Sequence, residues 1–216
     1  VHRSSFLEIL VFILMVNSSL RLSRDSSEFL SRTMTSTGDR KQYTFSCWIK
    51  RNQLQSASLL SVGSTADDRT EIGINGDQLF FKNEEGGDER EQKTTMVLRD
   101  VSSWYHICVA INLGSGGNSQ SKVKLFINGT QQTDLSTNNT MVDTHSLIST
   151  QNPHTIGKSS YANQDYADIY LAEVHFVGGS QLDPTSFTET KNGVLIPKEY
   201  TGSHGTNGFY LKFNQT

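Results

Sequence analysis

The stretch Asp168-Ile169-Tyr170-Leu171-Ala172-Glu173-Val174-His175-Phe176 decides the fold class, and the pair Gly178-Gly179 follows it closely. Side chains of an extended chain alternate between two faces. One face of this stretch therefore carries Tyr170, Ala172, Val174 and Phe176, and the other carries Ile169, Leu171, Glu173 and His175. The alternation predicts a β-strand with one face in a core and the other partly covered, ending at the glycine pair.

The chain after this strand reads as a short helical turn, a polar tail and a last strand. Asp183 is placed as an N-cap and Pro184 occupies the first helical position, so residues 182–187 are expected to form one helical turn. Residues 209–213, rich in aromatic side chains, are expected to form the final strand.

The chain before this strand contains many short apolar segments separated by polar turns. Asn75-Gly76 and Asn128-Gly129 are hairpin signals. Strands are expected at residues 20–23, 28–32, 43–50, 58–63, 70–75, 79–82, 94–98, 104–112, 122–127, 130–133 and 154–158. Such spacing is typical of an all-β, two-sheet antiparallel β-sandwich of the jelly-roll kind.

The composition fits one large all-β domain, expected over residues 17–216. The chain has 216 residues, 17 glycines and only 3 prolines, and its polar turns are rich in Ser, Thr and Asn. Its formal net charge of −3 gives no indication of a nucleic-acid-binding surface. We find no second domain boundary and no internal repeat.

Residues 1–16 stand apart from this pattern because residues 6–16 form the most apolar run of the chain. The run is shorter than a membrane-spanning helix requires, so no membrane span is expected. The basic residues His2 and Arg3 before the run and the small polar residues 17–19 after it resemble the flanks of a short signal peptide. The alternatives are sequence extraneous to the domain, or a buried helix or strand that leads into it.

Several motifs together resemble a known family. These are LRLSRDSSEFLSRT from Leu20, YTFSCWIKR from Tyr43, SWYHICVAI from Ser103, KLFINGTQQ from Lys124 and the order YLAEVHFVGG, QLDPTSF, IPKEYTG and GTNGFYLKF after Tyr170. They resemble the laminin-G-like, concanavalin A-like lectin domains of tailed, especially marine, bacteriophage tail or virion-associated proteins. The resemblance extends from Asn17 to the end of the chain. It implies the sandwich fold and a phage setting, but no particular ligand.

Four buried-type side chains in the predicted strands have structural explanations. Cys47 and Cys108 are expected to be buried thiols, and a disulfide would require their strands to be neighbours at the right separation. Trp48 is expected to anchor the core, and His106 to be a satisfied structural histidine.

Catalytic signatures are missing from the sequence. Hydrolases of this fold carry paired carboxylates in an E-x-D-x-x-E pattern on one strand, and the chain has no such pattern. We therefore expect a non-catalytic protein. The acidic loop at residues 84–91 offers oxygen ligands of the kind that calcium prefers, but its spacing matches no known calcium loop. We expect no cofactor, with calcium as the alternative.

The best candidate binding segment is the loop at residues 159–166. It combines the aromatic platforms Tyr161 and Tyr166 with the hydrogen-bonding groups of Asn163 and Asp165, the two kinds of group that bind sugars. The alternative is that the tyrosines fold back over a sheet edge.

The sequence thus predicts an extracellular or virion-borne module that attaches to surface glycan or another host-surface component. A purely structural virion module that contacts other virion proteins, or a secreted cellular adhesion domain, are the alternatives.

Overall fold

The computed structural model describes residues 16–214 and is an all-β sandwich of two antiparallel sheets. Residues 1–15, which include most of the apolar N-terminal run, lie outside the described part. Sheet A has the order β1-β13-β3-β8-β9-β10, with β16 also paired to β13. Its strands are β1 (Leu20–Leu22), β3 (Gln42–Arg51), β8 (Tyr105–Asn112), β9 (Val123–Ile127), β10 (Thr130–Gln131), β13 (Ile169–Gly178) and β16 (Phe209–Leu211).

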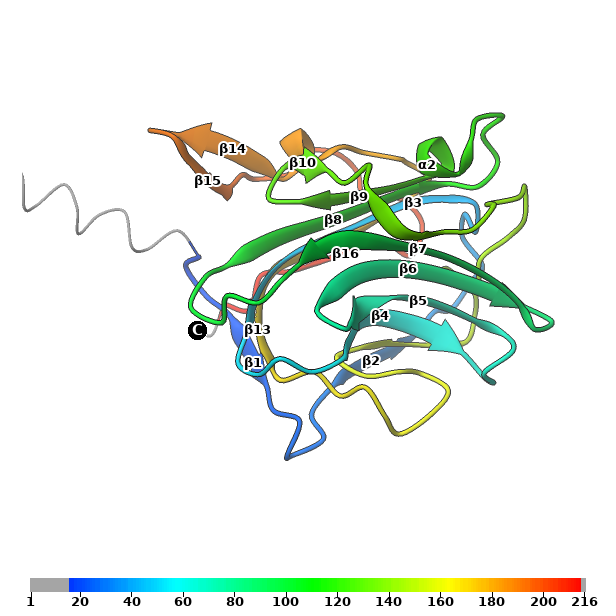
Figure 1. The fold of residues 1–216 in the computed structure, drawn as a ribbon, viewed down its shortest axis with the longest axis horizontal. Coiled ribbons are helices and arrows are strands. Elements are labelled where there is room, and N and C mark those ends of the chain that lie inside the picture. Colours follow the sequence, from blue (N-terminus) through cyan, green and yellow to red (C-terminus); the bar gives the residue numbers. More distant parts are fainter. Residues whose placement is uncertain (1–15, 215–216) are drawn as a thin grey trace, which may run out of the picture.

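Sheet B packs against sheet A and has the order β11-β7-β6-β5-β4-β12-β2. Figure 1 shows its long strands curving beside the strands of sheet A. The strands are β2 (Leu30–Thr33), β4 (Ala57–Gly63), β5 (Arg69–Asn75), β6 (Gln78–Glu85), β7 (Asp88–Val97), β11 (Leu135–Asn138) and β12 (Pro153–Ile156). The predicted two-sheet sandwich is confirmed.

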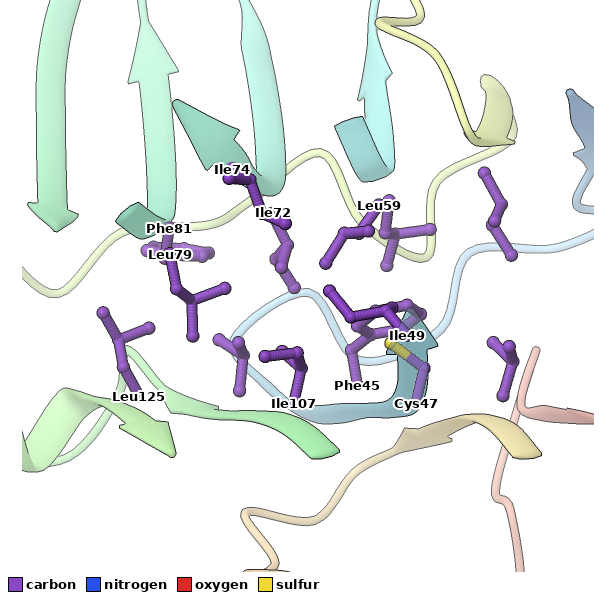
Figure 2. Close-up of a cluster of buried hydrophobic side chains, with 14 of the residues drawn as sticks. Phe45, Cys47, Ile49, Leu59, Ile72, Ile74, Leu79, Phe81, Ile107 and Leu125 are labelled. Carbon is purple, nitrogen blue, oxygen red and sulfur yellow. The ribbon is translucent and has the colours of Figure 1, made fainter. Parts of the chain in front are cut away.

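The core consists of the inner faces of the two sheets, the faces that they turn toward each other. Figure 2 shows aliphatic and aromatic side chains filling this layer from both sides. In β3 the predicted inner face is confirmed, since Tyr43, Phe45, Cys47 and Ile49 are completely buried in the core. Across the layer, Ile72 and Phe81 are equally buried.

The predicted facing of β13 is right for only half of the strand. Ile169 and Leu171 point into the core, and so do Val174 and Phe176. The inward positions therefore switch from odd-numbered to even-numbered residues within the strand. The cause is a β-bulge: the register with β3 shifts between Ala172 and His175, and Glu173 adopts a left-handed conformation with φ of 48°. A regular period of two cannot anticipate this extra residue.

Four further segments differ from the expectation. The acidic segment at residues 84–91 is not a long loop, because β6 and β7 continue through it to the tight turn at Gly86-Gly87. The predicted loop at residues 113–121 contains the start of the short helix α2 (Ser119–Lys122). The irregular segment at residues 135–149 begins with β11. The tail forms a hairpin of β14 (Thr188–Lys191) and β15 (Val194–Pro197), which projects at the upper left of Figure 1.

The outer face of sheet A is covered by the C-terminal segment. Asp183 caps the 3₁₀ turn η1 (Pro184–Ser186) as predicted, and Phe187 packs there against Cys108 and Val177. Cys47 points into the core and Cys108 into this second cluster, so the thiols lie on opposite faces of sheet A and both are free.

Trp48 and His106 also lie on this covered face. Trp48 is buried, but it packs on His106 at 5.3 Å between ring centroids and not in the main core where it was expected. His106 Nε2 is hydrogen-bonded to the Ser46 hydroxyl at 2.8 Å, in line with a structural role. The outer face of sheet B therefore becomes the natural place to look for a binding site.

Candidate functional site

Polar side chains from three neighbouring strands meet on the outer face of sheet B. The inward positions of β5 and β6 carry core residues such as Ile72 and Phe81, so the residues between them point outward. The strand register places Glu71 of β5 opposite Lys82 of β6, and Lys82 opposite Glu91 of β7. A row of alternating charge thus crosses the face.

One aromatic ring lies beside this charged row. Phe80 faces outward on β6 and is paired with Gly73 of β5. A Cβ atom at residue 73 would lie 2.9 Å from the Phe80 ring and 2.7 Å from the Ala57 carbonyl oxygen. Glycine is therefore required at this position for the ring to lie close against β5.

The loop at residues 159–166 runs beside the same face and is fixed to β4. The backbone N–H of Ser58 donates to the carbonyl of Asp165 at 3.0 Å, and the N–H of Ser160 donates to the Ser61 hydroxyl at 3.1 Å. Asp165 adopts a left-handed conformation with φ of 53°. These bonds hold the loop in a defined position over β4 and β5.

Loop and sheet together enclose a polar pocket of about 200 Å³. Its walls include Tyr161, Gln164 and Asp165 from the loop, and the lining from the sheet includes Arg69, Glu71, Phe80, Lys82 and Glu91. Gln164 donates a hydrogen bond to the Tyr161 hydroxyl at 2.8 Å, and the Arg69 guanidinium lies 4.8 Å from the centre of the Tyr161 ring. The tyrosine is therefore held in the pocket from two sides.

The structure brings two of the four predicted binding residues to this pocket and places the other two elsewhere. Tyr161 and Asp165 line the pocket. Asn163 instead accepts a hydrogen bond from Lys158 Nζ at 3.2 Å. Tyr166 packs edge-on against Phe29 with 6.3 Å between ring centroids. This contact agrees with the alternative interpretation of the loop, in which the tyrosines fold back over a sheet edge.

The two cations of the pocket are already paired. Arg69 Nη2 lies 3.0 Å from Glu84 Oε2. Lys82 Nζ lies 2.7 Å from Glu89 Oε2 and 3.3 Å from Glu91 Oε2. The charge of each cation is therefore largely balanced by carboxylates of neighbouring strands, and the Arg69 Nε donor has no hydrogen-bond partner.

Glu71 is different, because it is buried and none of the ion pairs found among residues 16–214 includes it. It is only 6% exposed, and the ion pairs of this range do not include Asp165 either. Burial raises the pKa of Glu71 from its ordinary value of 4.5 to about 6, and the charge of Asp165 adds to this. The Ser58 hydroxyl, Arg69 and Lys82 lower the pKa and offset part of the rise.

Sequence reasoning missed every residue that the sheet contributes to this pocket. The alternation of residues 70–75 and 79–82 does indicate that Glu71, Phe80 and Lys82 share an outward face. An outward phenylalanine opposite a glycine was the available signal, because such a pair is unusual on a face that only meets solvent. The position of the loop over that face could not be derived in the same way.

Two further kinds of site receive no support in the described part of the chain. No cluster of three or more His, Cys, Asp or Glu side chains among residues 16–214 is arranged to hold a metal ion. Within the same range, no helix has the length and apolar character needed to cross a membrane.

Comparison with known proteins places the chain in a family. Residues 24–185 match the family model described as the concanavalin A-like lectin/glucanases superfamily, laminin-G type. A search of curated protein sequences gives no match.

Solved structures share the fold at low sequence identity. Domains LG4-5 of the mouse laminin α1 chain superpose with a TM-score of 0.53 and 10% identity, covering 91% of this chain and 47% of that one. The receptor-binding domain of botulinum neurotoxin mosaic serotype C/D superposes with a TM-score of 0.52 and 11% identity, covering 79% of this chain and 41% of that one. Domain 4 of an extracellular arabinanase from Geobacillus stearothermophilus, in complex with arabinotriose, superposes with a TM-score of 0.51 and 13% identity. The match covers 77% of this chain and 73% of that one. The chain thus spans less than half of the laminin and neurotoxin chains.

Proposed function

The chain belongs to the concanavalin A-like lectin/glucanases superfamily, and from this premise we propose that it is a non-catalytic module that binds surface glycan. The proposed site is the pocket between the loop at residues 159–166 and strands β5 to β7. Tyr161, Asp165, Glu71 and Phe80 are the residues expected to contact the sugar.

The observation that carries this proposal is the combination of groups in the pocket. Sugar rings present apolar C–H faces and polar hydroxyl edges, so sugar sites combine aromatic surfaces with hydrogen-bonding groups. Tyr161 and Phe80 supply the first, and Gln164, Asp165 and Glu71 supply the second. The ordered loop and the paired strands hold these groups in place before any ligand arrives, which lowers the entropic cost of binding.

One structural neighbour adds support for the ligand class. Domain 4 of the arabinanase has the same fold and was solved with arabinotriose. At 13% identity this likeness concerns the fold, so it supports a saccharide as the class of ligand without indicating which one.

The biological setting is proposed from the sequence motifs alone. Their order resembles phage tail and virion-associated proteins, and attachment to a host surface is the role that a glycan-binding module would have there. We place the protein on a virion or otherwise outside the cell.

A glycan array probed with the full chain, with and without calcium, tests this function. We expect specific retention of one group of glycans in both buffers, because no cluster of three or more His, Cys, Asp or Glu side chains among residues 16–214 is arranged to hold a metal ion. No retention in either buffer would contradict the proposal and favour a purely structural module. Release of shortened sugars from the retained glycans would instead indicate a hydrolase, for which Glu71, with its raised pKa, is the candidate general acid.

A further inference from the structure

The charges of the pocket carry an inference about which saccharides it accepts, and this inference rests on the proposed function. Arg69 and Lys82 are the cations in the lining, and both are engaged by carboxylates of neighbouring strands. Glu71 and Asp165 are carboxylates in the lining without such a partner among residues 16–214. The groups left for a ligand are therefore mainly negatively charged acceptors.

Each class of sugar meets this arrangement differently. A hydroxyl can donate to the Glu71 carboxylate, and a hydrogen bond to a charged group contributes more than one between neutral groups. An ammonium group can donate and also neutralise the charge. A sugar carboxylate or sulfate would lose its hydration and meet like charges, and it would have to compete with Glu84, Glu89 and Glu91 for the two cations of the lining.

We propose that the pocket selects neutral and amine-bearing saccharides over acidic ones, and that Glu71 is the residue that determines this selection. Glu71 suits the role because it is 94% buried and lines the pocket, so its charge is poorly screened by water. Asp165, half-buried on the loop, reinforces it from the opposite wall.

The selection depends on pH, because the Glu71 carboxyl titrates in an accessible range. Burial, with the repulsion of Asp165, brings its pKa to about 6, and Arg69 of its own strand and Lys82 of β6 act in the opposite direction. Glu91 of β7 and Tyr161 of the loop are the other titratable groups of the lining, and Ser56 and Ala57, which line it at the start of β4, carry none. Below about pH 6, Glu71 takes up a proton and the pocket loses its strongest discrimination against acidic sugars.

The test uses glycans of matched length and linkage whose sugar units differ in one substituent, which is neutral, cationic or anionic. An array carries tetrasaccharides of glucose, glucosamine and glucuronate, all joined through β-1,4 linkages. It also carries the corresponding galactose, galactosamine and galacturonate series. The array is probed at pH 7 and pH 5 with the full-length wild type, Glu71→Gln, Asp165→Asn and the control Glu189→Gln. The control removes the same charge from the β14–β15 hairpin, outside the pocket.

At pH 7 we expect the wild type and Glu189→Gln to bind neutral and amine-bearing members at least about ten-fold more tightly than acidic members of the same series. Glu71→Gln is expected to weaken amine binding by about ten-fold or more, and Asp165→Asn to shift it in the same direction. Lowering the pH to 5 is expected to reduce the preference of the wild type and leave that of Glu71→Gln nearly unchanged.

Acidic members bound as tightly as neutral ones, or an unchanged order of binding in Glu71→Gln, would overturn the selection and leave glycan binding intact. A chain that retains no glycan of any series would overturn both the selection and the proposed function. Thermal unfolding of each variant shows whether a loss of binding reflects a loss of fold.

Discussion

Glu71 is kept in the pocket at a cost to the folded state. Its carboxylate is buried without an ion-pair partner in the described chain, and its pKa is raised to about 6. The folded protein therefore holds the proton to a higher pH than the unfolded chain does. The free energy of unfolding therefore falls as the pH rises from the ordinary pKa of 4.5 to about 6, the full penalty is present above about pH 6, and it is absent below 4.5.

Replacing Glu71 by Gln should consequently stabilise the protein at neutral pH. From the difference between 4.5 and about 6, the free energy of unfolding at pH 7.5 is expected to rise by about 2 kcal/mol, and to change little at pH 4. Urea denaturation at both pH values measures this. A stabilised variant with weakened glycan binding is typical of a functional residue. Equal or lower stability at pH 7.5 would show that the charge is compensated.

Arg51 is the opposite case, a buried charge whose partners are in place. It is 1% exposed, and its guanidinium donates to Asp77 at 2.9 Å and to the Gln55 carbonyl at 2.8 Å. The bond to Asp77 joins the end of β3 to the turn between β5 and β6, and the bond to Gln55 fixes the segment between β3 and β4. The side chain is therefore expected to be structural.

The Arg51→Met variant should lose about 3–5 kcal/mol of unfolding free energy, because it leaves buried acceptors without their donor. Arg99 provides a matched control, since it binds the same Asp77 at 3.0 Å but its side chain is 64% exposed. Arg99→Met is expected to cost at most about 1 kcal/mol. Similar losses in both variants, measured by chemical denaturation, would contradict this account of Arg51.

At the scale of single strands, the alternation of apolar and polar residues predicted where strands occur better than it predicted which side chains point into the core. The inner face of β3 follows the period of two throughout, whereas β13 changes parity at the bulge around Glu173. A bulge depends on the register with a neighbouring strand, which the local sequence does not contain. The β14–β15 hairpin was missed for a related reason, because its four-residue strands show little alternation of apolar and polar residues.

Strands β5 and β6 support the pocket through the contact of Gly73 with Phe80. A methyl group at residue 73 would lie 2.9 Å from the Phe80 ring and 2.7 Å from the Ala57 carbonyl oxygen, so ring or strand must move. The Gly73→Ala variant should lose about 1–3 kcal/mol of stability and bind glycan more weakly.

Gly116→Ala is the control for this change, because a Cβ atom there has no neighbour within 4 Å. Its stability is expected to stay within about 0.5 kcal/mol of the wild type, with unchanged binding. Calorimetric titration of both variants with a retained glycan compares their affinities. If Gly73→Ala bound the glycan with the affinity of the wild type, Phe80 would not be part of the binding site.

At the scale of the whole molecule, buried histidines set the response to acid. Burial lowers the pKa of His106 to about 3 and that of His175 to about 4, with the neighbouring His204 contributing to the latter. Both histidines are buried, and His175 packs against Phe187, Tyr200 and Tyr210 of the C-terminal segment that covers sheet A. As the pH falls below 6.5, the unfolded chain takes up protons that the folded protein does not, so stability decreases progressively toward pH 4.

We therefore expect unfolding free energy to fall between pH 6.5 and pH 4, despite the opposite and smaller contribution of Glu71. The His175→Phe variant keeps an aromatic ring against Tyr210, now 4.2 Å away between ring centroids, but cannot titrate. Its stability should depend less steeply on pH, whereas His145→Phe, at an exposed position, should behave like the wild type. Equal slopes in all three proteins would exclude His175 as a source of acid sensitivity.

The candidate site also belongs to this scale, which is why the sequence predicted only part of it. The loop was selected for its mixture of aromatic and polar residues, and Tyr161 and Asp165 do line the pocket. Asn163 and Tyr166 have the same chemistry but point elsewhere, because loop conformation decides the direction of each side chain. The other half of the pocket comes from strands about 70 to 95 residues earlier, and only the folded chain brings the two together.

The central claim is that this pocket binds the glycan, and Tyr161 and Tyr166 allow a matched test. Both tyrosines belong to one loop, but only Tyr161 lines the pocket. Titration calorimetry with the glycan retained most strongly on the array compares Tyr161→Ala with Tyr166→Ala. We expect at least about a ten-fold loss of affinity for Tyr161→Ala, from the lost aromatic contact, and an affinity near that of the wild type for Tyr166→Ala. Equal affinities in the two variants, or a loss confined to Tyr166→Ala, would contradict the assignment of this pocket.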